Sequence, residues 1–138
     1  MKWCMAKSLD AYVDTSALIA FADRSDTYHA FFTRLFAAPP KLVTSSLVIS
    51  EGHAWCLRRY DRTRALQFLA MIEDMHPLHV AAVGAKDVTS ATALLRKFSG
   101  QDLTVVDAVG LHLMKERRIR VCWSTDFHLG LTGADLLI

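Results

Sequence analysis

The sequence has few of the features that mark secreted, membrane-spanning or nucleotide-binding proteins. Its three cysteines, Cys4, Cys56 and Cys122, form no Cys-x-x-Cys pair, and its six histidines show no zinc-ligand spacing. No segment approaches the about 18 apolar residues of a membrane span, and residues 1–10 contain no apolar run long enough for a signal peptide. Glycine-rich phosphate-binding motifs are also missing. We therefore expect a reduced, cytoplasmic protein with no membrane association and no nucleotide cofactor.

The composition that remains is that of a folded domain. The chain has 138 residues, of which 52% are hydrophobic and 22% are charged, and a chain of this length can enclose one hydrophobic core. We expect a single domain over residues 1–138. The net charge of +2 is too small to identify a nucleic-acid-binding protein, because that signal requires basic side chains gathered on one face.

Short apolar segments alternate with segments of helical periodicity along the whole chain. The expected strands are residues 9–13, 41–44, 78–83, 119–123 and 135–138. The expected helices are residues 16–21, 26–36, 45–59, 61–73, 84–97 and 102–117. Where a capping residue is expected, the range begins with it. Their expected N-terminal caps are Asp26, Ser45 or Ser46, Asp61 and Asp102. This alternation predicts an α/β fold, a three-layer α/β/α domain in which helices flank a mostly parallel sheet of about five strands.

Two acidic residues directly follow expected strands. Asp14 comes after the first strand, and Asp126 comes shortly after residues 119–123. In open parallel sheets, ligands bind beyond the carboxyl ends of the strands, so both acids stand where a binding site is expected. Aspartate is also favoured in turns and caps, and either residue alone is equally consistent with a structural role.

Two further acids, Glu51 and Asp107, fall inside expected helices. The residues that share a helix face with them are mostly apolar: Leu47, Val48, Ala54 and Trp55 for Glu51, and Leu103, Thr104, Gly110 and Leu111 for Asp107. A buried carboxylate must be protonated, paired or metal-bound, and no lysine or arginine lies within one helical turn of either acid. A buried ion pair or a hydrogen-bonded acid remains the alternative. The pattern favours Mg²⁺ or Mn²⁺, which prefer oxygen ligands.

Four short motifs carry a resemblance to a known family. They are Tyr-Val-Asp-Thr-Ser-Ala-Leu at residues 12–18, Ser-Glu at 50–51, Leu-Thr-Val-Val-Asp-Ala at 103–108 and Ser-Thr-Asp-Phe-His at 124–128. In order and spacing they resemble those of the PIN-domain family, and within it the VapC-type toxin ribonucleases of toxin–antitoxin pairs, over nearly the whole chain. The resemblance implies a PIN-like fold, Mg²⁺- or Mn²⁺-dependent cleavage of single-stranded RNA, homodimers and a cognate antitoxin partner.

The same resemblance assigns residues to the site. It implies that Asp14, Glu51, Asp107 and Asp126 are the metal-binding and catalytic acids, with supporting hydroxyl groups from Thr15, Ser16 and Thr104. We expect Asp14 and Asp107 to bind the principal ion, Glu51 to orient or deprotonate the attacking water, and Asp126 to hold a weaker second ion. The chain departs from many relatives after Asp126, where Phe-His-Leu replaces a basic residue followed by a histidine and a phenylalanine.

Side chains near these motifs suggest further roles. Four arginines surround Tyr60 and could contact phosphates and unstacked bases, although a solvated helix junction explains them slightly better: Arg58, Arg59, Arg62 and Arg64. One apolar row is expected in the core rather than in an antitoxin groove: Phe31, Phe32, Leu35 and Phe36. His128 is the histidine nearest the site, and we favour a capping or packing role for it over a phosphate contact.

Three other functions fit parts of the sequence. A haloacid-dehalogenase-like phosphatase would use Asp14 as nucleophile, but Ser16 stands where such enzymes have a second aspartate. A non-toxin PIN nuclease of RNA processing would share all four acids. A catalytically silent PIN module that only binds RNA or an antitoxin would not need them.

Overall fold

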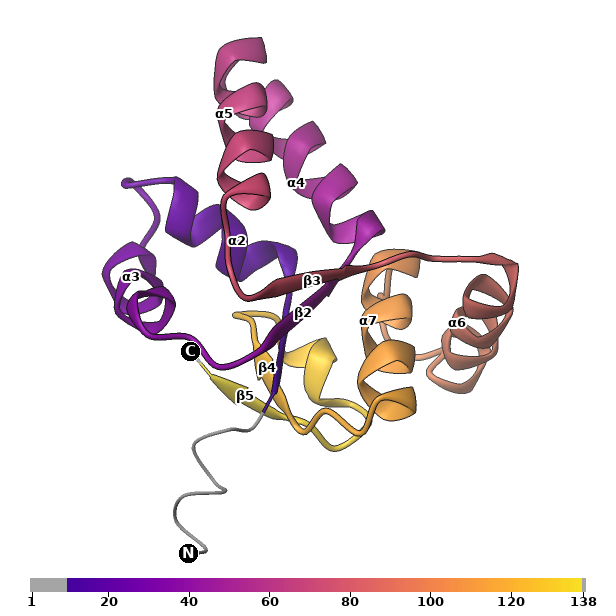
Figure 1. Cartoon of the computed structure of the whole chain (residues 1–138). Coiled ribbons are helices and arrows are strands. Elements are labelled where there is room, and N and C mark those ends of the chain that lie inside the picture. Colours follow the sequence, from indigo (N-terminus) through magenta and orange to yellow (C-terminus); the bar gives the residue numbers. More distant parts are fainter. Residues whose placement is uncertain (1–9, 138) are drawn as a thin grey trace, which may run out of the picture.

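The structure, a computed structural model, describes residues 10–137. Its centre is a five-stranded sheet with the strand order β3-β2-β1-β4-β5, in which all neighbours are parallel (Figure 1). The strands are β1 (Ala11–Val13), β2 (Leu42–Ser45), β3 (Leu78–Ala81), β4 (Val121–Trp123) and β5 (Asp135–Leu137). The predicted strands are therefore confirmed in place, although residues 9 and 138 lie outside the described residues and β3 and β4 are shorter than expected.

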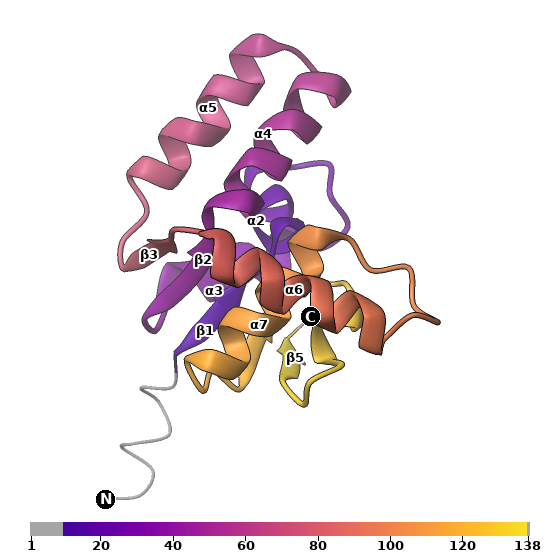
Figure 2. The same cartoon turned by 90° about the vertical axis from the view of Figure 1, so that its right-hand side faces the viewer.

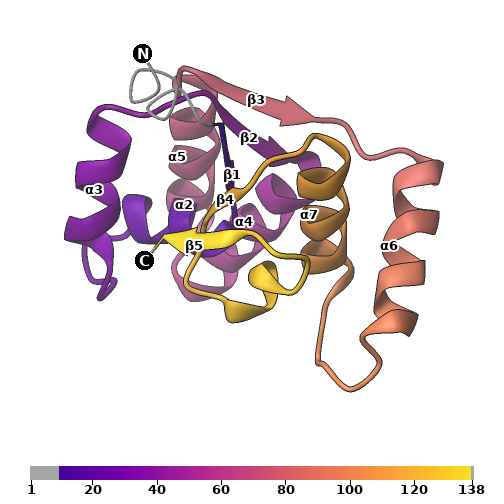
Figure 3. The ribbon, with the colours of Figure 1, turned by 90° about the horizontal axis from the view of Figure 1, so that it is seen from below.

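Helices cover both faces of this sheet. They are α2 (Thr15–Ala22), α3 (His29–Ala37), α4 (Ser46–Arg59), α5 (Arg62–Glu73), α6 (Ala85–Lys97) and α7 (Val105–Glu116), with a 3-10 helix η1 (Phe127–Gly130). Helices α2 and α3 lie on one side of the sheet, and α7 lies on the other side with α6 outside it (Figure 3). Helices α4 and α5 pair and extend away from the sheet (Figure 2). The predicted α/β fold with a parallel sheet flanked by helices is confirmed.

Two predicted caps agree with the structure and two do not. Ser45 accepts a hydrogen bond from the Val48 N–H, and Asp61 accepts one from the Arg64 N–H. Asp26 instead accepts from the Tyr28 N–H within a turn, and α3 begins at His29, two residues later than a cap at Asp26 would place it. Asp102 is also the wrong cap, since α7 begins at Val105 and is capped by the Thr104 hydroxyl.

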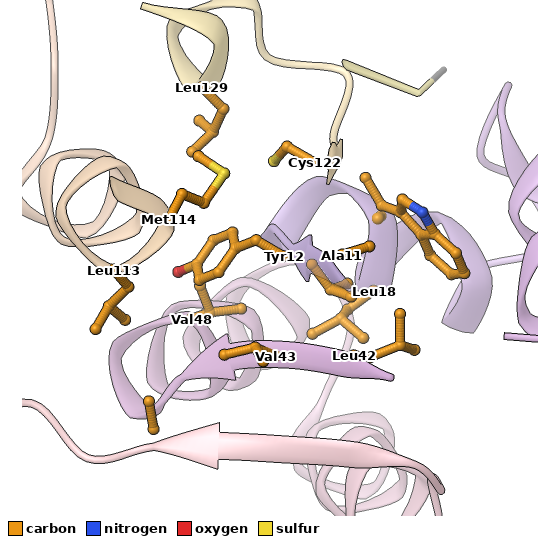
Figure 4. Close-up of a cluster of buried hydrophobic side chains, with 14 of the residues drawn as sticks. Ala11, Tyr12, Leu18, Leu42, Val43, Val48, Leu113, Met114, Cys122 and Leu129 are labelled. Carbon is orange, nitrogen blue, oxygen red and sulfur yellow. The ribbon is translucent and has the colours of Figure 1, made fainter. Parts of the chain in front are cut away.

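The core fills the space between the sheet and its helices. Tyr12 on β1 is fully buried among side chains from β2, α7 and η1, including Val43, Leu113, Met114 and Leu129 (Figure 4). A Cβ atom at Gly110 would lie 3.0 Å from Cε2 of Tyr12, tighter than an ordinary contact, so the glycine favours the close approach of α7 to β1. This approach sets the position of the first turn of α7 relative to the end of β1.

The aromatic row of α3 belongs to the core, as expected. Phe32 is fully buried, and the remaining members, Phe31, Leu35 and Phe36, are partly buried against the core cluster. The ring of Phe36 meets Trp123 of β4 edge to face, with 5.0 Å between centroids. Cys56 and Cys122 are free thiols, and Cys4 lies outside the described residues. Within residues 10–137, no helix has the length and apolar character needed to cross a membrane.

Candidate functional site

The carboxyl ends of β1 and β4 meet side by side and carry the first acids of the site. Val13 pairs with Trp123 in parallel register, and the Asp14 N–H donates to the Trp123 carbonyl at 3.1 Å. The chain therefore leaves both strands at the same edge of the sheet, with Asp14 directly after β1 and Asp126 three residues beyond β4. This is the edge at which parallel α/β proteins bind ligands.

One cleft of about 350 Å³ at this edge brings the predicted site residues together. We call it the carboxylate cleft; its lining is Asp14, Thr15, Ser16, Ile19, Glu51, Trp55, Arg58, Thr104, Asp107 and Asp126. All four acids and all three hydroxyl residues singled out in the sequence are among them. Their convergence is a property of the fold, while their chemical roles stay predictions.

Asp14 is the most enclosed of the four acids. It is 5% exposed, and burial raises the pKa of its carboxyl to about 6, although hydrogen bonds to the charged form oppose that shift and the nearby Asp107 adds to it. Its Oδ2 accepts from the hydroxyls of Ser124, at 2.9 Å, and Ser16, at 3.2 Å. A carboxylate in this position gains from a nearby cation.

Ser124 is a site residue that the sequence analysis did not single out. Its buried hydroxyl donates to Asp14 and accepts from the Asp126 N–H at 2.9 Å, so it links the two strand-end acids. Ser16 strengthens this link by accepting from the Thr125 N–H at 3.1 Å. The only sequence signal for Ser124 is its place within the motif at residues 124–128, directly after a buried strand.

Asp107 lies in the first turn of α7, not in the helix interior that the apolar stripe suggested. Its N–H donates to the Thr104 hydroxyl and its Oδ2 accepts from the Thr104 N–H, both at 3.1 Å, which is a capping box. Capping therefore explains part of why an acid stands at this buried position, where it is 8% exposed. The other carboxylate oxygen, Oδ1, forms no hydrogen bond within residues 10–137.

Glu51 reaches the cleft from the second turn of α4. Its Oε1 accepts a short hydrogen bond from the Thr15 hydroxyl at the start of α2. That bond joins α2 to α4 and fixes the carboxylate beside Asp14. Glu51 is only half-buried, so it faces the open cleft rather than the core.

Asp126 caps η1 and contacts a histidine. Its Oδ1 accepts from the His128 N–H at 3.0 Å and lies 2.8 Å from Nδ1 of the same residue. Ligand atoms of Asp107, Asp126 and His128 all lie within 4.8 Å of one another. Asp126 is therefore the cap of η1; of the capping or packing role predicted for His128, the packing is present, with its ring against Phe127.

The set of donor atoms in the carboxylate cleft fits a hard divalent cation. Within residues 10–137, the only ion pairs involve histidine, so no lysine or arginine neutralises Asp14, Glu51 or Asp107 by direct contact. Mg²⁺ and Mn²⁺ prefer carboxylate oxygens and retain several waters, which an open cleft can accommodate. The residues present thus suit the ion that the sequence analysis expected.

The arginine group divides between two surroundings. Arg58 lines the carboxylate cleft. Arg59 and Arg64 lie over the Tyr60 ring, with 5.2 and 4.8 Å from guanidinium carbon to ring centroid. Arg62 is the first residue of α5 and does not line the cleft. Of the four candidates for RNA contact, only Arg58 adjoins the acids, and two of the others belong to the α4–α5 junction.

A second group of acids and histidine lies away from the cleft, between α6 and α7. We call Asp87, His112 and Glu116 the helix-bound cluster. His112 Nε2 lies 3.0 Å from Asp87 Oδ1 and 3.8 Å from Glu116 Oε2. The Gly84 N–H at the start of α6 donates to Asp87 Oδ2 at 2.8 Å. Each group in this cluster already has a partner.

Known proteins share this fold and most of this length. The family model of the PIN domain matches residues 11–131, whereas no curated protein sequence matches the chain. The sarcin-ricin loop cleaving toxin VapC20 of Mycobacterium tuberculosis is similar, with a TM-score of 0.83, 25% identity, and coverage of 91% of this chain and 96% of that one.

Two complexes show the same fold at lower identity. They are VapBC2 of Rickettsia felis bound to promoter DNA, with TM-score 0.65, 13% identity and coverage of 94% and 98%, and a toxin–antitoxin complex of Klebsiella pneumoniae, with TM-score 0.62, 17% identity and coverage of 93% and 96%.

Proposed function

The chain belongs to the PIN domain family, and on this premise we propose that it is a divalent-metal-dependent endoribonuclease that cleaves single-stranded RNA. The observation that carries the proposal is the convergence of Asp14, Glu51, Asp107 and Asp126 on one cleft. No lysine or arginine among residues 10–137 pairs with Asp14, Glu51 or Asp107. Four negative charges close together cost free energy unless a cation compensates them. The compensating cation is the catalytic cofactor, Mg²⁺ or Mn²⁺.

The four carboxylates have different roles: some bind the ion, and one orients the attacking water. A divalent ion, when bound, acidifies a water and neutralises charge on the phosphate. Asp14, held by Ser124 and Ser16, and the free Oδ1 of Asp107 are the principal ligands. Glu51, oriented by Thr15, accepts the proton of the attacking water. Asp126 contributes to a second, weaker ion position.

The substrate is unpaired RNA that lies along the carboxylate cleft. Arg58 on the cleft rim supplies a guanidinium for a phosphate group, and Trp55 beside it supplies a ring for a base. Because VapC20 is a sarcin-ricin loop cleaving toxin, RNA of that loop is the first substrate to test.

The nuclease acts as the toxin of a toxin–antitoxin pair in the cytoplasm. The similarity to VapC20, and the presence of toxin–antitoxin complexes among proteins of the same fold, support this assignment. The partner is then a cognate antitoxin protein that blocks the cleft. Homodimer formation is part of the same proposal and is measured by light scattering of the purified protein.

Cleavage assays with matched variants test the enzyme. Purified protein is incubated with a single-stranded RNA and a sarcin-ricin loop RNA, with Mg²⁺, Mn²⁺ or a chelator. We expect cleavage by the wild type and by Asp87→Asn, which removes a charge outside the cleft, and none by Asp14→Asn or with chelator. Tight RNA binding without cleavage by the wild type would establish the silent binding module instead, and cleavage that survives the chelator would contradict the metal mechanism.

Expression in a bacterial host tests the toxin assignment. We expect induction of the wild-type chain to arrest growth and induction of Asp14→Asn to have no effect. If the wild type cleaves RNA in vitro but does not arrest growth, a nuclease of RNA processing is the correct function. The two assays therefore separate the reaction from its biological use.

A further inference from the structure

His128 places a ring nitrogen near two acids that line the carboxylate cleft and come from different elements. Asp107 comes from the first turn of α7, and Asp126 and His128 come from the start of η1. Ligand atoms of all three lie within 4.8 Å of one another. The tertiary fold brings Asp107 to this pair, since most of α7 and the whole of β4 separate it from Asp126.

The spacing of these atoms matches ligands around one ion. In an octahedral shell with bonds of about 2.1 Å, neighbouring ligand atoms lie about 3.0 Å apart and opposite ones about 4.2 Å apart. The distance between His128 Nδ1 and Asp126 Oδ1 is 2.8 Å. The remaining separations, up to 4.8 Å, need a movement of less than about 1 Å to fit the same shell.

The His128 imidazole lies against the ring of Phe127 and is itself largely enclosed. The rings of Phe127 and His128 lie 4.1 Å apart between centroids, with planes tilted by 32°. The His128 side chain is only 17% exposed, whereas that of Asp126 is 32% exposed and open to the cleft. A largely enclosed imidazole beside two carboxylates has the surroundings of a metal-ligating histidine.

We propose that His128 is a metal ligand, and that with Asp107 and Asp126 it forms a mixed nitrogen–oxygen position that prefers Mn²⁺ to Mg²⁺. The preference follows from ligand chemistry, because Mg²⁺ is bound through oxygen whereas transition ions accept imidazole readily. The proposal rests on the proposed metal-dependent function and deepens it by assigning the second ion. It replaces the capping or packing role that the sequence alone favoured for His128.

Pulsed electron paramagnetic resonance of bound Mn²⁺ tests this assignment without measuring activity. The unpaired electrons of Mn²⁺ couple to a directly bonded imidazole nitrogen. We expect a ¹⁴N coupling in the wild-type protein loaded with two equivalents of Mn²⁺. We expect its loss in His128→Ala and in His128→Gln, whose amide can still donate to Asp126, together with a roughly tenfold weaker second Mn²⁺ site by calorimetry. Mg²⁺ affinity should change little.

His112→Ala is the matched control, since His112 also contacts two acids but lies in the helix-bound cluster. The coupling should persist in this variant. Mn²⁺ binding without ¹⁴N coupling would overturn the role of His128 and leave the proposed nuclease intact. A coupling that survives in His128→Gln and disappears in His112→Ala would place the nitrogen ligand elsewhere and overturn it too. Failure of the wild type to bind any Mn²⁺ would overturn both proposals.

Discussion

The carboxylate cleft and the helix-bound cluster contain the same kinds of side chain but differ in how their charges are compensated. In the helix-bound cluster, Asp87 accepts from the N–H of Gly84, the residue before α6, and faces His112, and these contacts lower the pKa of its carboxyl. In the carboxylate cleft, burial raises the pKa of Asp14 to about 6. The surroundings of Asp87 therefore stabilise its anion, whereas burial destabilises the anion of Asp14.

This difference distinguishes a structural ion pair from a binding site. The helix-bound cluster comes from two adjacent helices and connects them. The carboxylate cleft collects acids from β1, α4, α7 and the segment after β4, four elements far apart in sequence. Acids that converge in one cleft without a paired cation raise the free energy of the folded state, through burial and mutual repulsion. A bound cation offsets this cost.

Removal of one cleft acid should give the largest effect. We expect Asp107→Asn to lower the rate of RNA cleavage by about 10³-fold, because a principal ligand of the ion that would neutralise charge on the phosphate is lost. The amide oxygen can still accept from the Thr104 N–H, so the capping box and the fold should persist. Initial rates at saturating Mn²⁺ measure this, with circular dichroism as the check on folding. An equal loss of cleavage rate in Asp87→Asn would contradict the claim that only the carboxylate cleft takes part in the reaction.

The pH dependence of stability should have opposite signs in the two regions. Between pH 3.8, the ordinary pKa of an aspartate carboxyl in the unfolded chain, and about pH 6, folded Asp14 keeps a proton that the unfolded chain releases. The contribution of protonated Asp14 to the free energy of unfolding is therefore fully present below pH 3.8 and is lost as pH rises to about 6. The loss amounts to about 3 kcal/mol.

Urea unfolding with chelator, from pH 4 to pH 7, measures this effect as the difference between wild type and Asp14→Asn. The variant should lack the decline and be the more stable protein at pH 7. For Asp87 the pKa is lowered, so its contribution is present above its unfolded pKa and is lost as pH falls. Asp87→Asn should therefore be less stable than wild type at pH 7. A variant Asp14→Asn that is destabilised at pH 7 would contradict the destabilisation of the Asp14 anion by burial and by the nearby Asp107.

Metal should stabilise the protein through the cleft alone. At a free Mn²⁺ concentration about one hundred times Kd, we expect the free energy of unfolding to rise by about 2.7 kcal/mol. Asp14→Asn should lose most of this increase, and His112→Ala should keep it. Thermal unfolding with and without Mn²⁺ makes the comparison. Loss of the increase in His112→Ala alone would locate the ion in the helix-bound cluster.

The smallest effect should come from the histidine between α6 and α7. His112→Ala removes a hydrogen bond to Asp87 and the packing of a side chain that is 15% exposed. We expect the melting temperature to fall by about 2–4 °C and the cleavage rate at saturating Mn²⁺ to stay unchanged. A fall in the cleavage rate without a fall in stability would show that the two regions communicate.

Local chemistry made much of the fold predictable. Ser45 and Asp61 are caps because their side chains satisfy N–H groups three residues away, which the sequence reveals directly. Thr104 and Asp107 also form such a local pattern, but the apolar stripe around Asp107 indicated the helix interior instead. The error at Asp102 arose because two capping-type residues stand two positions apart and only tertiary packing selects between them.

Long-range contacts set the limit of prediction within the site. The strand ends and helix periodicity indicated where four acids would lie, since parallel strands end at one edge. The hydrogen bond from Ser124 to Asp14 joins residues 110 positions apart in the chain, and no local sequence pattern at either residue predicts it. The division of the arginines, with Arg58 in the cleft and Arg64 over Tyr60, likewise depends on how α4 packs against α5.

A crystal grown with Mn²⁺ and measured at its absorption edge tests the central claim most directly. We expect the strongest anomalous peak in the carboxylate cleft, within coordination distance of Asp14 and Asp107. A cleft without such a peak at saturating Mn²⁺, or a strongest peak between Asp87 and His112, would contradict it.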